Sequence, residues 1–197
     1  MMLKHRLEPQ LLGGRHVVLE PLAPKHFDGL RAAARDEAIW RYLPVDGFAD
    51  FQAFWDGAEA DRDQRGRMPF AVVRKSDGAV VGTTSYLNHV PQHARVEIGW
   101  TWYAPSVQGT AVNPECKLLL MAHAFEACGY HRVELNTCST NLRSRAAIKR
   151  LGAKEDGILR GHMWMPRGYW RDTVCHSLLA EEWPAAKEVL ERRVGQA

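Results

Sequence analysis

The sequence predicts an α+β fold with about seven strands, in a single domain that spans residues 1–197. Three observations indicate this class. An aromatic, β-rich run at 97–103 passes through a short loop into a clearly marked helix. Segments that alternate apolar and polar residues stand between segments whose apolar residues recur at helical spacing. After a first strand their order is two helices, three strands, a helix, a strand, a helix and two strands, which is typical of α+β proteins.

The N-terminal third is expected to hold one strand and two helices. A short β-like run at 16–20 comes first. Pro24 then opens a helix that continues to residue 34, because proline suits the first helical position. A second helix is expected at 48–63, where apolar residues recur at helical spacing. Between the two helices, an aromatic segment at 38–43 is stopped by Pro44.

Three strands follow, at 70–75, 79–89 and 96–103. The residues Ser76-Asp77-Gly78 form a hairpin signal between the first two of them. Gly82 and Gly99 lie inside strands, where a glycine indicates a bulge or a close backbone approach.

The central helix is expected at 113–128. Asn113 is the expected N-cap, because its side-chain oxygen can accept a hydrogen bond from a free backbone N–H. Pro114 would then occupy the first helical position, and Glu115 would place negative charge at the positive end of the helix dipole. Gly129 stands where a left-handed C-terminal cap is expected.

The C-terminal part alternates strands with helices. Residues 132–138 alternate apolar and polar side chains and predict a strand. A helix at 141–151 is expected between an N-cap at Asn141 and a stop at Gly152. The remaining elements are strands at 155–165 and 170–179, a turn at 166–168 and a terminal helix at 183–194.

Composition excludes several function classes. Apolar residues make up 46% and charged residues 25% of the chain, which is ordinary for a soluble globular protein. A net charge of +3 is too small to indicate nucleic acid or an anionic membrane as a partner. We find no run of membrane-spanning length, and residues 1–9 lack the apolar core of a signal peptide.

The four cysteines are scattered, without a Cys-x-x-Cys pair. They indicate reduced thiols in the cytoplasm and neither a metal site nor a disulfide framework. Cys138 lies near the site proposed below, so a reactive thiol there is an alternative to simple packing.

The loop at 108–113 has a physical consequence of its own. A strand, a loop of small residues and a helix N-terminus expose several backbone N–H groups in one place, and such a place binds anions, above all phosphates. A plain strand–helix connection is the alternative, because the loop matches neither the Walker motif nor the dinucleotide fingerprint.

The same segment resembles motif A of the GNAT acyltransferases, within them the branch of ribosomal-protein N-terminal acetyltransferases. That family has an Arg/Gln-x-x-Gly-x-Gly/Ala loop around the pyrophosphate of acetyl-CoA. Gln108, Ala111 and Asn113 fall on its signature positions, where Ala111 replaces the usual glycine and Asn113 replaces a small residue. The resemblance covers about residues 12–183 and implies a central mixed, mostly antiparallel sheet between layers of helices.

The segment 141–153 resembles a second motif of the family. There, an Asn contacts the pantetheine arm or orders the site, and a nearby Ser lies by the thioester sulfur; Asn141 and Ser144 match these positions. The alternative is that Asn141 only caps the helix. The helix also has a basic face, for which we expect solvation, except that Arg145 is a candidate for the phosphate end of CoA.

The resemblance therefore implies acetyl-CoA as co-substrate, without a metal. The expected cofactor-binding residues are Trp102, Tyr103, Gln108, Gly109, Thr110, Ala111, Val112, Asn113, Asn141 and Arg145.

Acetyl transfer to an amine requires a neutral amine, a polarised thioester carbonyl and a proton for the leaving group. Glu97 is the candidate base, through water, and a surface or ion-paired strand Glu is the alternative. Ser144 is the candidate acid and Tyr103 its rival. A backbone N–H near Trp102 or Tyr103 would donate to the developing oxyanion. His89, His93, His123 and His162 lack partner spacing and are expected to be structural or exposed.

The acceptor is expected to enter opposite the cofactor, between the first two helices and the last hairpin. Trp40, Tyr42 and Trp164 are the candidate substrate-binding residues of an aromatic rim that suits an apolar or peptide-like acceptor. Exposed aromatic residues would equally suit a homodimer interface.

The expected function is N-acetyl transfer from acetyl-CoA to a primary amine, such as a protein N-terminus, an amino acid or a small amine. Alternatives are another acyl donor such as succinyl-CoA, a catalytically silent CoA-binding module, and nucleic-acid binding through the basic helix face. The small net charge counts against the last of these.

Overall fold

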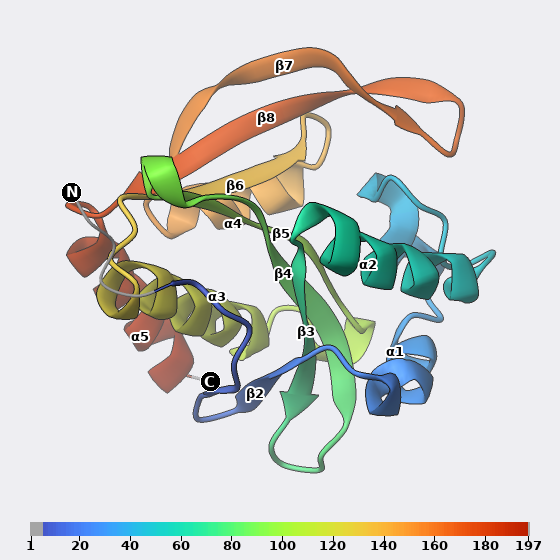
Figure 1. Ribbon diagram of the computed structural model, residues 1–197. Coiled ribbons are helices and arrows are strands. Elements are labelled where there is room, and N and C mark those ends of the chain that lie inside the picture. Colours follow the sequence, from blue (N-terminus) through green and yellow to red (C-terminus); the bar gives the residue numbers. More distant parts are fainter. Residues whose placement is uncertain (1–5, 197) are drawn as a thin grey trace.

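The structure is a computed structural model that describes residues 6–196. Its centre is one mixed sheet with strand order β1-β2-β3-β4-β5-β6-β8-β7 (Figure 1). The strands are β1 (Leu12–Gly13), β2 (Val17–Pro21), β3 (Met68–Arg74), β4 (Val80–Val90), β5 (Arg95–Tyr103), β6 (Arg132–Cys138), β7 (Lys154–Met165) and β8 (Tyr169–Leu179). The prediction of an α+β fold is confirmed, with eight strands in place of about seven. The additional strand, β1, has two residues and is too short to show a periodic pattern.

Helices cover both faces of the sheet (Figure 1). They are α1 (Phe27–Ala33), α2 (Phe51–Arg65), α3 (Val112–Ala122), α4 (Leu142–Arg150) and α5 (Trp183–Gly195). Side chains of α3, α4 and α5 share one hydrophobic cluster with the sheet, and those of α1 and α2 share a second. The segment predicted at 38–43 is a 3₁₀ helix, Glu37–Tyr42. The second predicted helix begins later than expected, because Asp50 caps it by accepting from the N–H of Ala53.

The only parallel pair among the described strands is β5 with β6. This pairing is short, because it runs only from Arg95 opposite Arg132 to Glu97 opposite Glu134. Beyond Glu97, β5 stays paired with β4, and β6 stays paired with β8. The sheet therefore opens between the C-terminal halves of β5 and β6.

A β-bulge marks the start of this opening. Between the pairs Thr83–Trp102 and Ser85–Gly99, one residue of β4 faces two residues of β5. One of these two, Trp100, has a positive φ of 50°. A bulge bends its strand and increases the local twist, which directs β5 away from β6. The predicted close backbone approach at Gly82 is confirmed, since a Cβ there would lie 2.3 Å from the carbonyl oxygen of Trp102.

The start of α3 differs from the prediction. The helix begins at Val112, so Asn113 lies inside its first turn and is not the N-cap. Ala111 already has helical angles, with φ −65° and ψ −15°, which moves the helix start back by two residues. The Thr110 hydroxyl accepts a hydrogen bond from the N–H of Val112 at 3.3 Å. At the other end, a π-helical turn at His123–Ala127 follows, and Gly129 takes the predicted left-handed conformation.

Glu115 lies in the first turn of α3, as predicted, and its side chain is buried. Its carboxylate accepts hydrogen bonds from the backbone N–H groups of Arg15, His16 and Val17 at 2.6–2.7 Å. These residues form the turn between β1 and β2. The start of α3 is thereby fixed to the edge of the sheet.

No helix within residues 6–196 is long and apolar enough to cross a membrane. The expectation that no signal peptide is present concerned residues 1–9, of which 1–5 lie outside the described range.

Candidate functional site

The gap between β5 and β6 exposes one backbone edge of β5. The N–H of Ala104 donates to the carbonyl of Val81 on β4, and the carbonyl of Trp102 also points at β4. Because backbone groups alternate along a strand, the N–H and C=O of Tyr103 point the other way, into the gap. Of the two predicted donors to an oxyanion, only the N–H of Tyr103 therefore lies on the open side.

The loop from Gln108 to Asn113 joins this edge to α3. The N–H groups of Gln108, Thr110 and Val112 are hydrogen-bonded within the loop. Those of Gly109, Ala111 and Asn113 have no hydrogen-bond partner within residues 6–196. Three free N–H groups at the start of a helix form a site for an anion.

Two residues of the loop have conformations that bear on this site. Gly109 has a φ of +83°, which side chains with a Cβ rarely adopt. Ala111 has a φ of −65°, a value that residues with a Cβ adopt readily. The departure from the family pattern at this position therefore costs no backbone strain.

The side chain of Gln108 connects three elements. Its Nε2 donates to the carbonyl of Tyr103 at 2.9 Å, and its Oε1 accepts from Arg143 of α4 at 2.7 Å. Arg143 is thus the basic residue of α4 that contacts the loop. Arg145, the predicted candidate, is paired with Glu155 of β7 at 3.3 Å and donates to the carbonyl of Ser139. A contact of Arg145 with the phosphate end of CoA stays a prediction.

Asn141 caps α4 as predicted, since its Oδ1 accepts from the N–H of Ser144 at 3.1 Å. This bond supports the structural alternative for Asn141, whose contact with a ligand stays a prediction. Ser144 is partly buried in the first turn of α4. Its role as an acid likewise stays a prediction.

Glu97 lies where β5 and β6 separate, and its side chain is only 7% exposed. Asn88 donates to its carboxylate at 2.7 Å. Burial raises the pKa of Glu97 above its usual range, while hydrogen bonds from Asn88 and Asn136 oppose the shift. A carboxylate with a raised pKa suits a general base better than an ordinary surface glutamate does.

Three aromatic candidates point into the core and not into the gap. Tyr103 belongs to the cluster beneath α3, where its hydroxyl lies beside Cys116 and burial raises its pKa well above the usual value. Trp102 belongs to the cluster beneath α1 and α2, and Trp40 packs against it with ring centroids 5.5 Å apart. Trp40 is 3% exposed and its indole N–H donates to the carbonyl of Ala34. The prediction that Trp40 lines an open rim is therefore wrong, and a role for Trp102 is restricted to its backbone.

The other two candidates for the acceptor side lie on the surface. Tyr42 is half-buried, and its hydroxyl reaches the carbonyl of Thr140 at 3.5 Å. Trp164 of β7 is 56% exposed and packs edge-on against Trp170 of β8. The 3₁₀ segment that carries Tyr42 is joined to the hairpin, because Arg171 donates to the carbonyl of Tyr42 at 3.0 Å.

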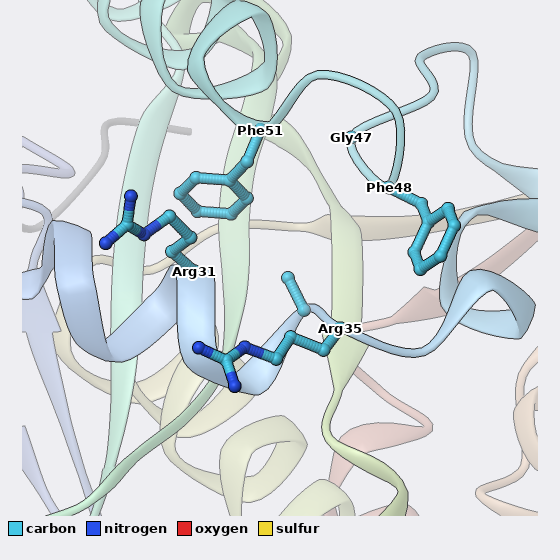
Figure 2. A pocket seen from close by; sticks show the side chains of 6 residues that line it. Arg31, Arg35, Gly47, Phe48 and Phe51 are labelled. Carbon is cyan, nitrogen blue, oxygen red and sulfur yellow. The ribbon is translucent and has the colours of Figure 1, made fainter.

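A surface pocket of about 660 Å³ lies at the end of α1 (Figure 2). Its lining residues are Arg31, Ala34, Arg35, Gly47, Phe48 and Phe51. Figure 2 shows the guanidinium groups of Arg31 and Arg35 extending to the same side, with Phe48 at the opposite end. No residue of the 108–113 loop lines this pocket, and Gly47 packs on Trp40, which separates the pocket from β5.

Two buried cations near the site were missed by the sequence analysis. Lys117 of α3 donates to the hydroxyl of Thr101 on β5 at 3.2 Å, and burial lowers its pKa to about 8. Arg171 of β8 is 9% exposed. Lys117 sits at a helical position between buried residues, so periodicity alone could have marked it. Nothing local in the sequence marks Arg171.

The histidines are placed as expected for structural or exposed residues. His123 is buried against Gln10 and Tyr86, His89 contacts Tyr130, His162 contacts Thr173, and His93 is exposed. Within residues 6–196, no group of three or more His, Cys, Asp or Glu side chains could hold a metal ion.

Comparison with known proteins gives a consistent result. The family model of the acetyltransferase (GNAT) domain matches residues 16–154. A relative in Bacillus subtilis (strain 168), named "Putative ribosomal N-acetyltransferase YdaF", is 32% identical over 111 residues, which cover 56% of this chain and 60% of YdaF.

Solved structures share the fold. A GCN5-related N-acetyltransferase from Brucella melitensis is 33% identical, with a TM-score of 0.86 over 94% of this chain and 86% of that chain. RimJ of Mycobacterium smegmatis, solved with CoA-disulfide, has a TM-score of 0.78 at 24% identity, over 98% of this chain and 97% of that chain. At that identity the likeness to RimJ concerns the fold alone.

Proposed function

Since the chain belongs to the acetyltransferase (GNAT) family and is an acyl-CoA-dependent acetyltransferase, we propose that it transfers an acetyl group from acetyl-CoA to a primary amine, by direct transfer between two bound substrates. The observation that carries the proposal is the gap between β5 and β6, which ends at three free N–H groups of the loop and helix start.

The residues of this gap fit coenzyme A. The N–H groups of Gly109, Ala111 and Asn113 would hold its pyrophosphate, because amides at a helix start bind phosphate oxygens. Arg143 adds a positive charge beside them and fixes Gln108. The N–H of Tyr103 would hold the thioester carbonyl, and Asn141 and Ser144 would flank the pantetheine arm. When bound, acetyl-CoA supplies an acetyl group activated as a thioester.

Different residues of the chain would carry out the separate proton transfers of the reaction. Glu97 accepts a proton from the acceptor ammonium, through water, which leaves a neutral amine able to attack. The N–H of Tyr103 donates to the oxygen on which negative charge develops. Ser144 donates a proton to the leaving sulfur as the C–S bond breaks, and its hydroxyl is restored by the second proton, which the newly acylated nitrogen gives up. The buried hydroxyl of Tyr103 faces Cys116, so its position favours Ser144 over Tyr103 as the acid.

We further propose that the acceptor is a protein N-terminus. The name of YdaF, which is similar over about half of this chain, supports a ribosomal protein. The acceptor side is formed by the 3₁₀ segment with Tyr42 and by the β7–β8 hairpin with Trp164. An amino acid or a small amine is the alternative acceptor.

Two alternatives to acetyl transfer are retained. The loop amides do not distinguish acetyl-CoA from succinyl-CoA, so another acyl donor is one alternative. A module that binds CoA without turnover is the other.

The deciding experiment combines binding with turnover. Thermal unfolding is measured with acetyl-CoA, succinyl-CoA, free CoA and ATP, since a ligand at about a hundred times its dissociation constant adds about 2.7 kcal/mol of stability. Release of CoA thiol is then followed with N-terminal peptides of ribosomal proteins and with small amines. We expect a CoA-specific shift and peptide-dependent release. Binding without release would favour the silent module, and no shift at millimolar CoA would contradict the proposed site.

A cytoplasmic location and a homodimer also belong to the proposal. All four cysteines are free, which suits a reducing compartment. Exposed Trp164 and Trp170 on the hairpin would suit a second copy of the chain. Sedimentation equilibrium of the wild type and of Trp170→Ser tests the dimer, and a monomeric wild type would contradict it.

A further inference from the structure

Lys117 is an unusual residue in the core of this protein. It is 8% exposed, lies one and a half turns into α3, and has a single hydrogen-bond partner within residues 6–196, the hydroxyl of Thr101. Burying an ammonium group costs several kcal/mol unless charge and hydrogen bonds compensate. A neutral side chain of the same length would fill this position at lower cost. The lysine therefore requires a reason beyond packing.

Its surroundings lead to the point where β5 leaves β6. Thr101 is one of the two bulge residues of β5, and its hydroxyl also meets that of Thr84 on β4 at 2.8 Å. Ile98 faces the cluster beneath α3, so Glu97, its neighbour in the strand, faces the opposite side. Lys117 and Glu97 thus lie on opposite faces of β5 with Gly99 between them, since the Thr101 hydroxyl donates to the carbonyl of Gly99 at 3.3 Å and a Cβ on Gly99 would lie 3.2 Å from Glu97 Oε1. Burial lowers the pKa of Lys117, and the charge of Glu97 opposes that shift.

We propose that Lys117 is a positioning residue for Glu97: its ammonium group, held on the helix side of β5 by Thr101, keeps the carboxylate on the other side of the strand ionised. This inference rests on the proposed role of Glu97 as base. The interaction is mutual, because two charges act on each other with the same energy. An ionised Glu97 is the form that accepts a proton from the acceptor amine.

Some of the other groups that face Glu97 oppose its ionisation, so a cation on the α3 side of β5 would help to keep its carboxylate ionised. Glu134 of β6 opposes ionisation, and burial does the same. Arg171 of β8 and the amides of Asn88 and Asn136 favour it. Arg171 is committed to Thr173 and to the carbonyl of Tyr42. Cys116, beside Lys117, has a pKa raised to about 12 by burial and stays neutral.

The test measures the proton affinity of Glu97 directly. The side-chain carboxyl carbons of glutamate are titrated by NMR in the free protein, and Glu97→Gln identifies the signal. Lys117→Met removes the charge at similar length, and Lys117→Arg keeps it. We expect the midpoint of Glu97 to rise in Lys117→Met and to stay near the wild-type value in Lys117→Arg. Arg192→Met, which removes an exposed cation of α5, is the matched control and leaves the midpoint unchanged.

An unchanged midpoint in Lys117→Met would overturn the inference. If that variant does not fold, the reciprocal measurement decides: Glu97→Gln should lower the pKa of Lys117, read from its Nζ signal, and equal values in the two proteins would overturn it.

Turnover separates this inference from the proposed function. The acid limb of the kcat/KM profile should move to higher pH in Lys117→Met by the same amount as the titration. If Glu97→Gln keeps full turnover while the NMR midpoints still shift, the role of Glu97 as base fails and the coupling stands. A loss of turnover in Lys117→Met without any change in either pH profile would indicate a purely structural lysine.

Discussion

Glu97 shows how one strand residue is given the properties of a base. The carboxylate is taken out of water but keeps hydrogen bonds from amide groups, so that burial raises its pKa without removing all support for the charge. Its place at the last β5–β6 pair puts it at the inner end of the gap.

Replacing Glu97 by Gln should lower turnover by about 10²–10⁴-fold, because Gln cannot accept the proton. Acetyl-CoA binding, measured by thermal shift, should be unchanged. Glu134→Gln on the neighbouring strand is the control and should keep most of the activity. Equal losses in the two variants would argue against Glu97 as base.

The same substitution should change stability in a pH-dependent way. The pKa of Glu97 is higher in the folded chain than the ordinary value of 4.5, so the folded state is disfavoured where the carboxyl is ionised. Glu97→Gln should therefore raise the melting temperature at neutral pH. The gain should shrink as the pH falls through the raised pKa toward 4.5, which calorimetry across that range would detect.

At this scale the sequence predicts positions better than orientations. Glu97, Asn141 and the loop residues could be located from motif spacing. The side chains of Trp102 and Tyr103 could not be assigned to a face, because the bulge at Trp100 and Thr101 changes the alternation of β5 and is not visible in the sequence. Arg143 and Arg145 are two residues apart, and only the ion pair with Glu155 shows which of them is engaged elsewhere.

At the scale of elements, the loop and α3 form one unit. Gly109 supplies a left-handed residue, the Thr110 hydroxyl binds the first helical N–H, and alternate amides stay free. The N-cap is Ala111, two residues before the predicted Asn113, because Ala111 has helical angles although it is a weak N-cap.

Gly109→Ala should cost about 1–2 kcal/mol in the loop, because alanine disfavours a φ of +83°. It should also weaken acetyl-CoA binding in calorimetric titrations. Gly152→Ala is the matched control, since Gly152 has a φ of +97° at the end of α4, away from the loop amides. We expect similar destabilisation but normal binding in the control. Normal binding in both variants would show that the loop conformation does not matter for the ligand.

Arg143→Ala should release Gln108 and weaken acetyl-CoA binding by up to about tenfold, or about 1.4 kcal/mol. Arg150→Ala on the same helix should bind normally, because within residues 6–196 the guanidinium of Arg150 donates only to the carbonyl of Ala146. If Arg145→Ala weakens binding more than Arg143→Ala does, the assignment of Arg143 is wrong.

At the scale of the whole molecule, the order of helices and strands could be predicted, because each long element has a clear period. The additional strand β1 and the connection through Glu115 could not. β1 has two residues and is too short for a periodic pattern, and the Glu115 contact joins residues about a hundred positions apart, which local patterns do not report.

Glu115→Ala should be among the most destabilising substitutions of a polar residue. It leaves three backbone N–H groups without their acceptor, and bonds to a charged group contribute about 1.5–3 kcal/mol each. We expect a loss of about 3 kcal/mol or more in urea unfolding. Glu188→Ala on the exposed face of α5 is the control, with a change within about 0.5 kcal/mol. A small effect of Glu115→Ala would mean that water replaces the carboxylate.

The short parallel pairing of β5 and β6 has a consequence for deuterium exchange. Two strands in the middle of an eight-stranded sheet each keep an edge that is unpaired beyond Glu97 and Glu134 within the described chain. The amide of Tyr103 should then exchange as fast as an amide at the outer rim of a sheet, and it should become slow when acetyl-CoA binds. On the time scale of exchange, the free protein would behave as two sheets joined by three residue pairs, and the ligand would make them one.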